Sequence, residues 1–135
     1  MTKQKGIDFL VQVNTGTAEV PVYKTVGAQR GASLSRSAET LDATSKESEG
    51  WSESLAGLKS WSISTDGLLV LDDEAYGLLE EAFMNSENVL VQIASKSGLK
   101  YAGDAIITTF DIDAPYDDLA TYSIELTGAN KLEKL

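Results

Sequence analysis

Alternating apolar and polar residues predict β-strands over much of the chain. Residues 7–13 and 120–127 carry apolar side chains at every second position, which is typical of strands with one buried face. Residues 20–26 predict a further strand, and Pro21 places it at a sheet edge or a strand start because proline has no N–H for a ladder. Both halves of the chain therefore contribute strands.

A helix and a hairpin are expected in the second half. Residues 58–71 form an apolar-rich strand, residues 72–85 follow with a helical period, and Asp72 is placed to cap the first turn. Residues 89–94 and 99–112 flank a four-residue polar turn, the pattern of a hairpin. The helix has one apolar stripe, made of Ala75, Leu79, Ala82 and Phe83.

These elements predict one domain over residues 1–135 with a mainly β, α+β fold. We expect an antiparallel β-sandwich or partly closed barrel, one flanking α-helix and a long extended loop. The loop is residues 35–51, SRSAETLDATSKESEGW, which have neither a helical nor a strand period. Loops of this length are usually functional or disordered.

Absent residue types exclude most catalytic chemistry. The chain has no cysteine and no histidine, so disulfides, thiolate or imidazole metal ligands and Ser–His or Cys–His nucleophile pairs are impossible. A glycosidase would need two carboxylates across a cleft, and the sequence singles out no such pair. We therefore expect no enzyme activity, no cofactor and no metal.

A monomeric β-sandwich that binds sugar or calcium stays open as an alternative. Trp51 and Trp61 are ten residues apart, so they would share a face if one unbroken strand joined them. A flexible acidic loop could supply oxygen ligands to calcium. Its candidate ligands are Asp111, Asp113, Asp117 and Asp118.

The charge of the chain opposes nucleic-acid binding. The net charge is -10, and residues 66–87 hold seven carboxylates without a basic residue. Tight binding to nucleic acid needs Lys and Arg against phosphates.

No apolar run reaches the length of a membrane span, and the first residues lack the apolar core of a signal peptide. We expect a cytoplasmic protein that leaves the cell only within a larger object, with no membrane partner.

Three motifs together resemble the major tail tube protein of long-tailed, non-contractile phages. They are R-x-A-x-L-x-R-S-x-E-T-x-D-x-T from Arg30, W-x-E-x-L-x-G-L-x-S-W-S-I from Trp51, and A-P-Y-D-D-L-A-T-Y from Ala114. The resemblance extends from Lys5 to Gly128. The same fold serves the inner tubes of contractile tails and of secretion systems, which is the alternative within this class.

The resemblance implies a structural virion protein. Its subunits would form hexameric rings that stack into the tail tube, the conduit for genome delivery into the host. It implies a tape measure protein in the lumen, and tail terminator and tail tip proteins at the ends. Double-stranded DNA would pass through without specific binding. Assembly would take place in the host cytoplasm, and the final location would be the virion tail.

The polar segment suits a role as an arm between subunits. If residues 37–50 run out and back, each limb spans at most about 23 Å, whereas a chain of this length has a radius of gyration of about 14 Å. Such an arm reaches a neighbour, and its polarity keeps it soluble until it orders on assembly. The candidate contacts are Ser37, Glu39, Thr40, Asp42, Thr44, Lys46, Glu47, Glu49 and Trp51.

The acidic balance also suits the wall of a channel for DNA. Six copies carry about -60 (6 × -10), but salt screens the field beyond about 8 Å. The field therefore keeps phosphates from adhering to the wall and does not push the DNA along. The candidate lumen-facing residues are Asp104, Asp111, Thr121, Ser123 and Glu125.

Overall fold

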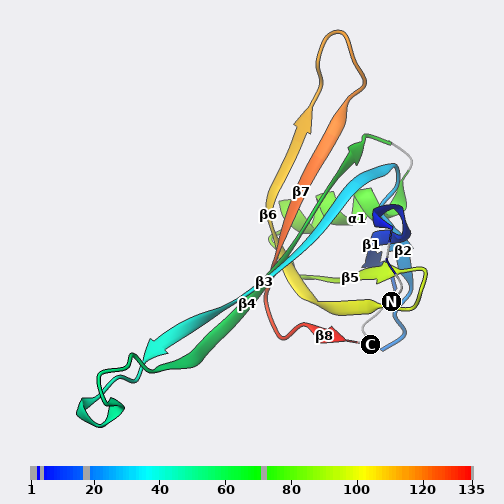
Figure 1. Cartoon of the computed structure of the whole chain (residues 1–135). Coiled ribbons are helices and arrows are strands. Elements are labelled where there is room, and N and C mark those ends of the chain that lie inside the picture. The colour runs from blue at the N-terminus through cyan, green and yellow to red at the C-terminus, as the bar shows by residue number, and fades with distance from the viewer. Residues whose placement is uncertain (1–2, 4, 17–18, 71–72, 135) are drawn as a thin grey trace.

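An eight-stranded antiparallel sheet organises the protein (Figure 1). The computed structural model describes residues 3, 5–16, 19–70 and 73–134. The strand order is β2-β1-β5-β6-β7-β4-β3, with β8 beside β6. The elements are η1 Gly6–Asp8, β1 Phe9–Asn14, β2 Tyr23–Thr25, β3 Gln29–Asp42, η2 Lys46–Ser48, β4 Ser54–Leu68, α1 Glu74–Met84, β5 Val89–Ser95, β6 Lys100–Asp113, β7 Thr121–Gly128 and β8 Glu133–Lys134.

The expected fold class, mainly antiparallel β with one flanking helix, is confirmed, but the sheet is not closed. Its path ends at β2 on one side and at β3 on the other. The Gln29 side chain bridges part of the gap, because its amide accepts the Val11 N–H at 3.0 Å and donates to the Val11 carbonyl at 2.6 Å. A side-chain amide thus continues the ladder along β1 where β2 has ended.

The core lies between the sheet and α1. Tyr122, Ile124 and Leu126 of β7 alternate with exposed residues and are buried, as the sequence pattern predicts. Tyr76 of α1 packs its ring 5.4 Å from Phe110 and 5.9 Å from Tyr122, measured between ring centroids. The buried face of α1 is Ala75, Tyr76, Leu79 and Ala82, while Phe83, expected in that stripe, is 41% exposed.

Asp73 caps α1 and ties it to the sheet. Its carboxylate accepts the Ala75 N–H at 3.3 Å and the Gly27 N–H at 2.6 Å. Asp72, expected to make the cap, lies outside the described residues. The expected helix over 72–85 is observed over Glu74–Met84.

Two strands are shorter in the structure than the alternation of apolar and polar residues predicts. Gly6–Asp8 forms a 3-10 turn, so β1 begins at Phe9, and Ile7 is 79% exposed. The strand expected over 20–26 is paired over Tyr23–Thr25, where β1 offers a ladder. The hairpin of β5 and β6 agrees with the prediction.

The largest difference lies in residues 35–51, where a loop without structure was predicted. β3 and β4 pair from Gln29 opposite Gly67 out to Asp42 opposite Ser54, so a long two-stranded ribbon leaves the body (Figure 1). Its outer part is exposed on both faces and has no apolar alternation. Periodicity detects burial rather than pairing, which explains why the sequence pattern fails here.

The end of this ribbon is held by its own polar side chains. The Thr44 hydroxyl accepts the Glu53 N–H at 2.8 Å and donates to the Glu53 carbonyl at 3.3 Å. Ser45 and Ser48 form a reciprocal capping box around η2. In the conformation described these residues are therefore ordered by local hydrogen bonds, while their ordering on assembly stays a prediction.

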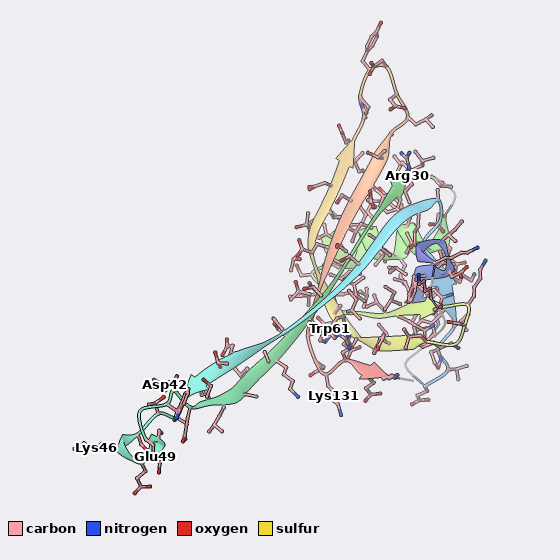
Figure 2. The ribbon with its side chains drawn as sticks, in the orientation of Figure 1. Arg30, Asp42, Lys46, Glu49, Trp61 and Lys131 are labelled. Carbon is pink, nitrogen blue, oxygen red and sulfur yellow. The ribbon has the colours of Figure 1, made fainter. Side chains whose placement is uncertain are left out.

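Trp61 fixes the point at which the ribbon leaves the body (Figure 2). Its indole Nε1–H donates to the Asn130 carbonyl at 2.7 Å, and the side chain is buried. A Cβ at Gly128 would lie 2.2 Å from the indole nitrogen, and one at Gly103 would lie 2.7 Å from the ring. Both positions must be glycine for the ring to fit. Trp51 lies outside β4 and is 77% exposed, so the two tryptophans do not form a sugar-binding face.

We expect Trp61→Ala to lower the free energy of unfolding by about 3–5 kcal/mol, because it leaves a cavity. It also orphans the Asn130 carbonyl. Trp51→Ala is the matched control, since substitution of an exposed side chain changes stability by about 0.5 kcal/mol or less. Urea unfolding of dispersed protein followed by circular dichroism measures both variants. Equal losses would contradict the role assigned to Trp61.

Candidate functional site

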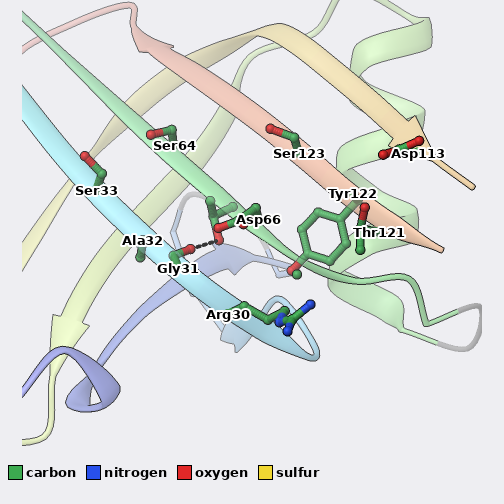
Figure 3. Close-up of a pocket in the computed structure, with 12 residues that line it drawn as sticks. Arg30, Gly31, Ala32, Ser33, Ser64, Asp66, Asp113, Thr121, Tyr122 and Ser123 are labelled. Atoms are coloured by element: carbon green, nitrogen blue, oxygen red, sulfur yellow. Dashed lines mark hydrogen bonds between the residues drawn. The ribbon is translucent and has the colours of Figure 1, made fainter. Parts of the chain in front are cut away.

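One face of strands β3, β4, β7 and β6 is covered by short polar side chains. Directly opposed residues in these strands share a face, as in Ser33 with Ser64 and Ser64 with Glu125. Figure 3 shows Ser33, Ser64 and Ser123 in a row across three strands. We name this surface the polar face; its polar residues are Ser33, Ser35, Ser37, Ser60, Ser62, Ser64, Asp66, Thr109, Asp111, Asp113, Thr121, Ser123, Glu125 and Thr127.

The polar face is acidic. It carries four carboxylates, and the apolar side chains on it are Leu68 and Ile106. Thr108, the extra residue of a bulge in β6, bonds the Glu125 carbonyl at 3.2 Å and the Thr127 hydroxyl at 3.3 Å. The opposite face of the same strands holds the buried core. The sheet therefore presents one surface to α1 and a different surface outward.

Four of the five predicted lumen residues come together on the polar face. Asp111 is opposite Ser123, and Glu125 and Thr121 lie along the same strand face. Asp104 lies apart, in the half of β6 that pairs with β5, where it is opposite Leu90. Burial, and then the Asp104 carboxylate, raise the pKa of Tyr23 there.

Two strand edges that are unpaired within the described part of the chain flank the polar face. β3 pairs with β4 on one side and ends the sheet on the other. β5 covers β6 only as far as Ala105, so residues 106–113 of β6 have a partner on the β7 side alone. Such edges offer N–H and C=O groups to another chain.

The predicted arm residues lie along the projecting hairpin, which we define as residues 37–60. Ser37, Glu39, Thr40 and Asp42 belong to β3, and the Asp42 carboxylate accepts the Thr44 N–H at 3.0 Å. Hydrogen bonds from the Thr44 side chain and backbone lower the pKa of Asp42. The remaining candidates surround η2 at the tip: Thr44, Lys46, Glu47, Glu49 and Trp51.

Sequence reasoning missed the apolar side chains of this hairpin. Leu41 and Leu55 are opposite each other and more than half exposed, and Leu58 is 77% exposed. Each is a single apolar residue among polar neighbours, so no periodic signal marks it. Single exposed apolar side chains are common on protein surfaces, so these residues do not by themselves mark an interface.

No metal site forms among the described residues. No group of three or more carboxylates is close enough to hold an ion in that part of the chain. Asp111 and Asp113 lie on the polar face, and Asp117 and Asp118 lie in the connection to β7. No helix in the same residues is long and apolar enough to cross a bilayer.

A family model described as phage tail tube protein matches residues 3–134. The chain belongs to this family. Among curated proteins the tail tube protein has no match. Its fold is close to that of a chain in the C6-symmetric tail of an empty gene transfer agent particle, with 28% identity, 98% of this chain and 99% of that chain covered, and a TM-score of 0.87.

More distant structures share the fold of this tail tube protein. The SPP1 tail tube gives a TM-score of 0.81 at 13% identity, covering 98% of this chain and 78% of that one. A sheath–tube complex of an extracellular contractile injection system gives 0.66 at 15% identity, covering 98% and 91%. The tail tube role expected from the sequence motifs is confirmed by the family.

We expect Tyr122 to make the stability of the tail tube protein depend on pH in the alkaline range. Burial, then the Asp73 and Asp66 carboxylates, raise the pKa of Tyr122 to about 12, and its hydroxyl donates to the Gly27 carbonyl at 3.1 Å. A raised pKa stabilises the fold fully below the ordinary value of about 10, and this contribution is lost as the pH rises toward 12.

Urea unfolding at intervals between pH 9 and pH 12 measures this effect. Tyr122→Phe should reduce the loss of stability above pH 10 relative to the unaltered chain. Tyr116→Phe, at a fully exposed position, is the control and should leave the pH dependence unchanged. Identical curves for Tyr122→Phe and the unaltered chain would contradict the assignment.

Proposed function

We propose that six copies of this tail tube protein close into a ring through their unpaired strand edges, and that the rings stack into a tube. The observation that carries the proposal is the polar face, bounded by the free edge of β3 on one side and the free edge of β6 on the other. A ring uses both edges, since one copy's β3 meets the next copy's β6. The C6 symmetry of the related gene transfer agent tail supports the number six.

Ring dimensions agree with a conduit. Each copy would contribute β6, β7, β4 and β3, so six copies of four strands give 24 strands. At about 4.8 Å between strands the ring measures about 115 Å around, or about 37 Å across, before strand tilt widens it. A barrel of this size encloses an open channel rather than a packed core.

The polar face would line this channel. Its opposite face is buried under α1 and the core, so the polar face is the surface of this sheet that remains free for the lumen. Its hydroxyls and the carboxylates of Asp111 and Glu125 do not attract phosphates, and one basic residue, Arg30 at the bulge of β3, lies beside it. The DNA would therefore pass without specific binding.

The proposed role is structural, without catalysis. We further propose a tape measure protein in the lumen during assembly, and terminator and tip proteins at the ends of the tube. A baseplate and a sheath/tube terminator appear among the related structures, which supports end-binding partners. The assembled protein would be located in the tail of a phage or phage-like particle.

Shortening the projecting hairpin tests whether it joins subunits. Ala38 and Lys59 are directly opposite, so replacing residues 39–58 with Asn-Gly closes β3 and β4 by a two-residue turn. We expect a folded subunit, by circular dichroism, that forms no tubes in negative-stain images. Tubes of normal length would contradict the role of the hairpin. An unaltered chain that forms no tubes would contradict the ring proposal itself.

Charge reversal on the polar face tests its place in the lumen. We expect Asp111→Lys with Glu125→Lys to leave tubes intact and to slow DNA ejection, because cations on the wall bind phosphates. Glu80→Lys with Glu81→Lys makes the same change in charge on the exposed side of α1 and should not slow ejection. Ejection from particles assembled with each variant is followed by a DNA-binding dye. Equal rates of DNA ejection for the two double variants would contradict the placement of the polar face in the lumen.

A further inference from the structure

Four of the chain's 11 basic residues gather at the base of the projecting hairpin. Arg36 and Lys59 come from β3 and β4, and Lys131 and Lys134 come from the segment that ends in β8. They line a groove of about 990 Å³ whose lining residues include no carboxylate. We name it the basic groove. In the sequence Arg36, Lys59 and the Lys131–Lys134 segment are far apart.

Among the residues that the structure describes, the cations of the basic groove form no ion pair. The ion pair found among residues 19–70 and 73–134 is Lys24 with Glu74, far from this groove. Arg36 stacks its guanidinium 5.0 Å from the centre of the Tyr101 ring. The indole of Trp61 and the side chain of Leu132 add apolar lining. A ligand of this groove should therefore combine negative charge with an apolar part.

The tip of the projecting hairpin has that chemistry. Between Asp42 and Glu53 it carries four carboxylates against one lysine, and all five side chains are exposed. Trp51, the most exposed apolar residue of the tip, stands among them. The hydrogen bonds around η2 hold the tip in shape, so little ordering entropy opposes its binding.

A tip cannot reach the groove of its own chain. Figure 2 shows Lys46 and Glu49 at the far end of the projecting hairpin and Lys131 near Trp61, at its base. The strands between them are continuous from Trp61 to Ser54. The partner must therefore be another molecule.

We propose that the basic groove binds the acidic tip of a second copy of this chain. This inference rests on the proposed function, because it assumes that copies stack. Each copy has one tip and one groove, so the contact is head-to-tail and repeats without closing along the tube. Exposed charges act within about 8 Å at physiological salt. They therefore select the correct register, while the apolar side chains contribute the buried area.

Charge reversal and its rescue test the proposal. Lys59→Glu with Lys131→Glu, and separately Glu47→Lys with Glu49→Lys, should each abolish tubes in negative-stain images while the subunits stay folded by circular dichroism. The four changes combined restore opposite charges on tip and groove and should restore tubes. Normal tubes from either double variant, or no tubes from a folded combined variant, would overturn the proposal.

A control variant distinguishes the effect of changing charges in the groove from the effect of changing the net charge of the chain. Lys5→Glu with Lys96→Glu changes the net charge by the same amount at exposed positions away from the groove. This variant should form tubes as the unaltered chain does. Loss of its tubes would overturn the assignment of the effect to the groove. If the unaltered chain forms no tubes, the proposed function fails instead.

Disulfide trapping gives a direct readout, since the natural chain has no cysteine. A disulfide requires Cα atoms within about 7 Å. Oxidised tubes of a Glu49→Cys, Lys131→Cys variant should give a ladder of linked chains on a non-reducing gel. Glu49→Cys with Lys96→Cys should give no ladder. Tubes of the first variant that yield no ladder would overturn the proposal.

Discussion

The packing of the Trp61 indole against the backbone of Gly103 and Gly128 joins the projecting hairpin to the body of the sheet. The ring packs where β4 stops being part of the sheet and continues as one limb of the hairpin. Its hydrogen bond to Asn130 brings the segment before β8 to the same point. A smaller residue there would leave a cavity at the base of the hairpin. The basic groove, which Trp61 helps to line, lies at the same point.

The two faces of the sheet have different roles in this fold. Tyr122, Ile124 and Leu126 bury one face of β7, and Ser123 and Glu125 cover the other. The free energy of folding comes from the first face, through apolar burial. The second face is therefore free to carry chemistry that folding does not require. Short hydroxyl and acidic side chains occupy it in β3, β4, β6 and β7.

Sequence reasoning reached those elements whose burial gives a period. The alternation of 120–127 and the stripe of α1 gave the correct element types, because burial repeats every two residues in a strand and nearly every four in a helix. It failed for 35–51, where main-chain pairing without burial leaves no such repeat. The basic groove could not be foreseen, since Arg36 and Lys131 meet only through pairing between distant segments. Three sequence motifs were enough to indicate the family.

The shortness of the side chains on the polar face has a mechanical consequence. Serine and threonine have one rotatable bond before the hydroxyl and lose little entropy when fixed, whereas lysine, arginine and glutamine have several. A channel lined by the polar face, as proposed above, would therefore carry mainly serine and threonine side chains, which are too short to narrow it much when they change rotamer. Friction on a passing polymer would then depend on the water that hydrates these hydroxyls. The ease of passage would follow from residue size as well as from charge.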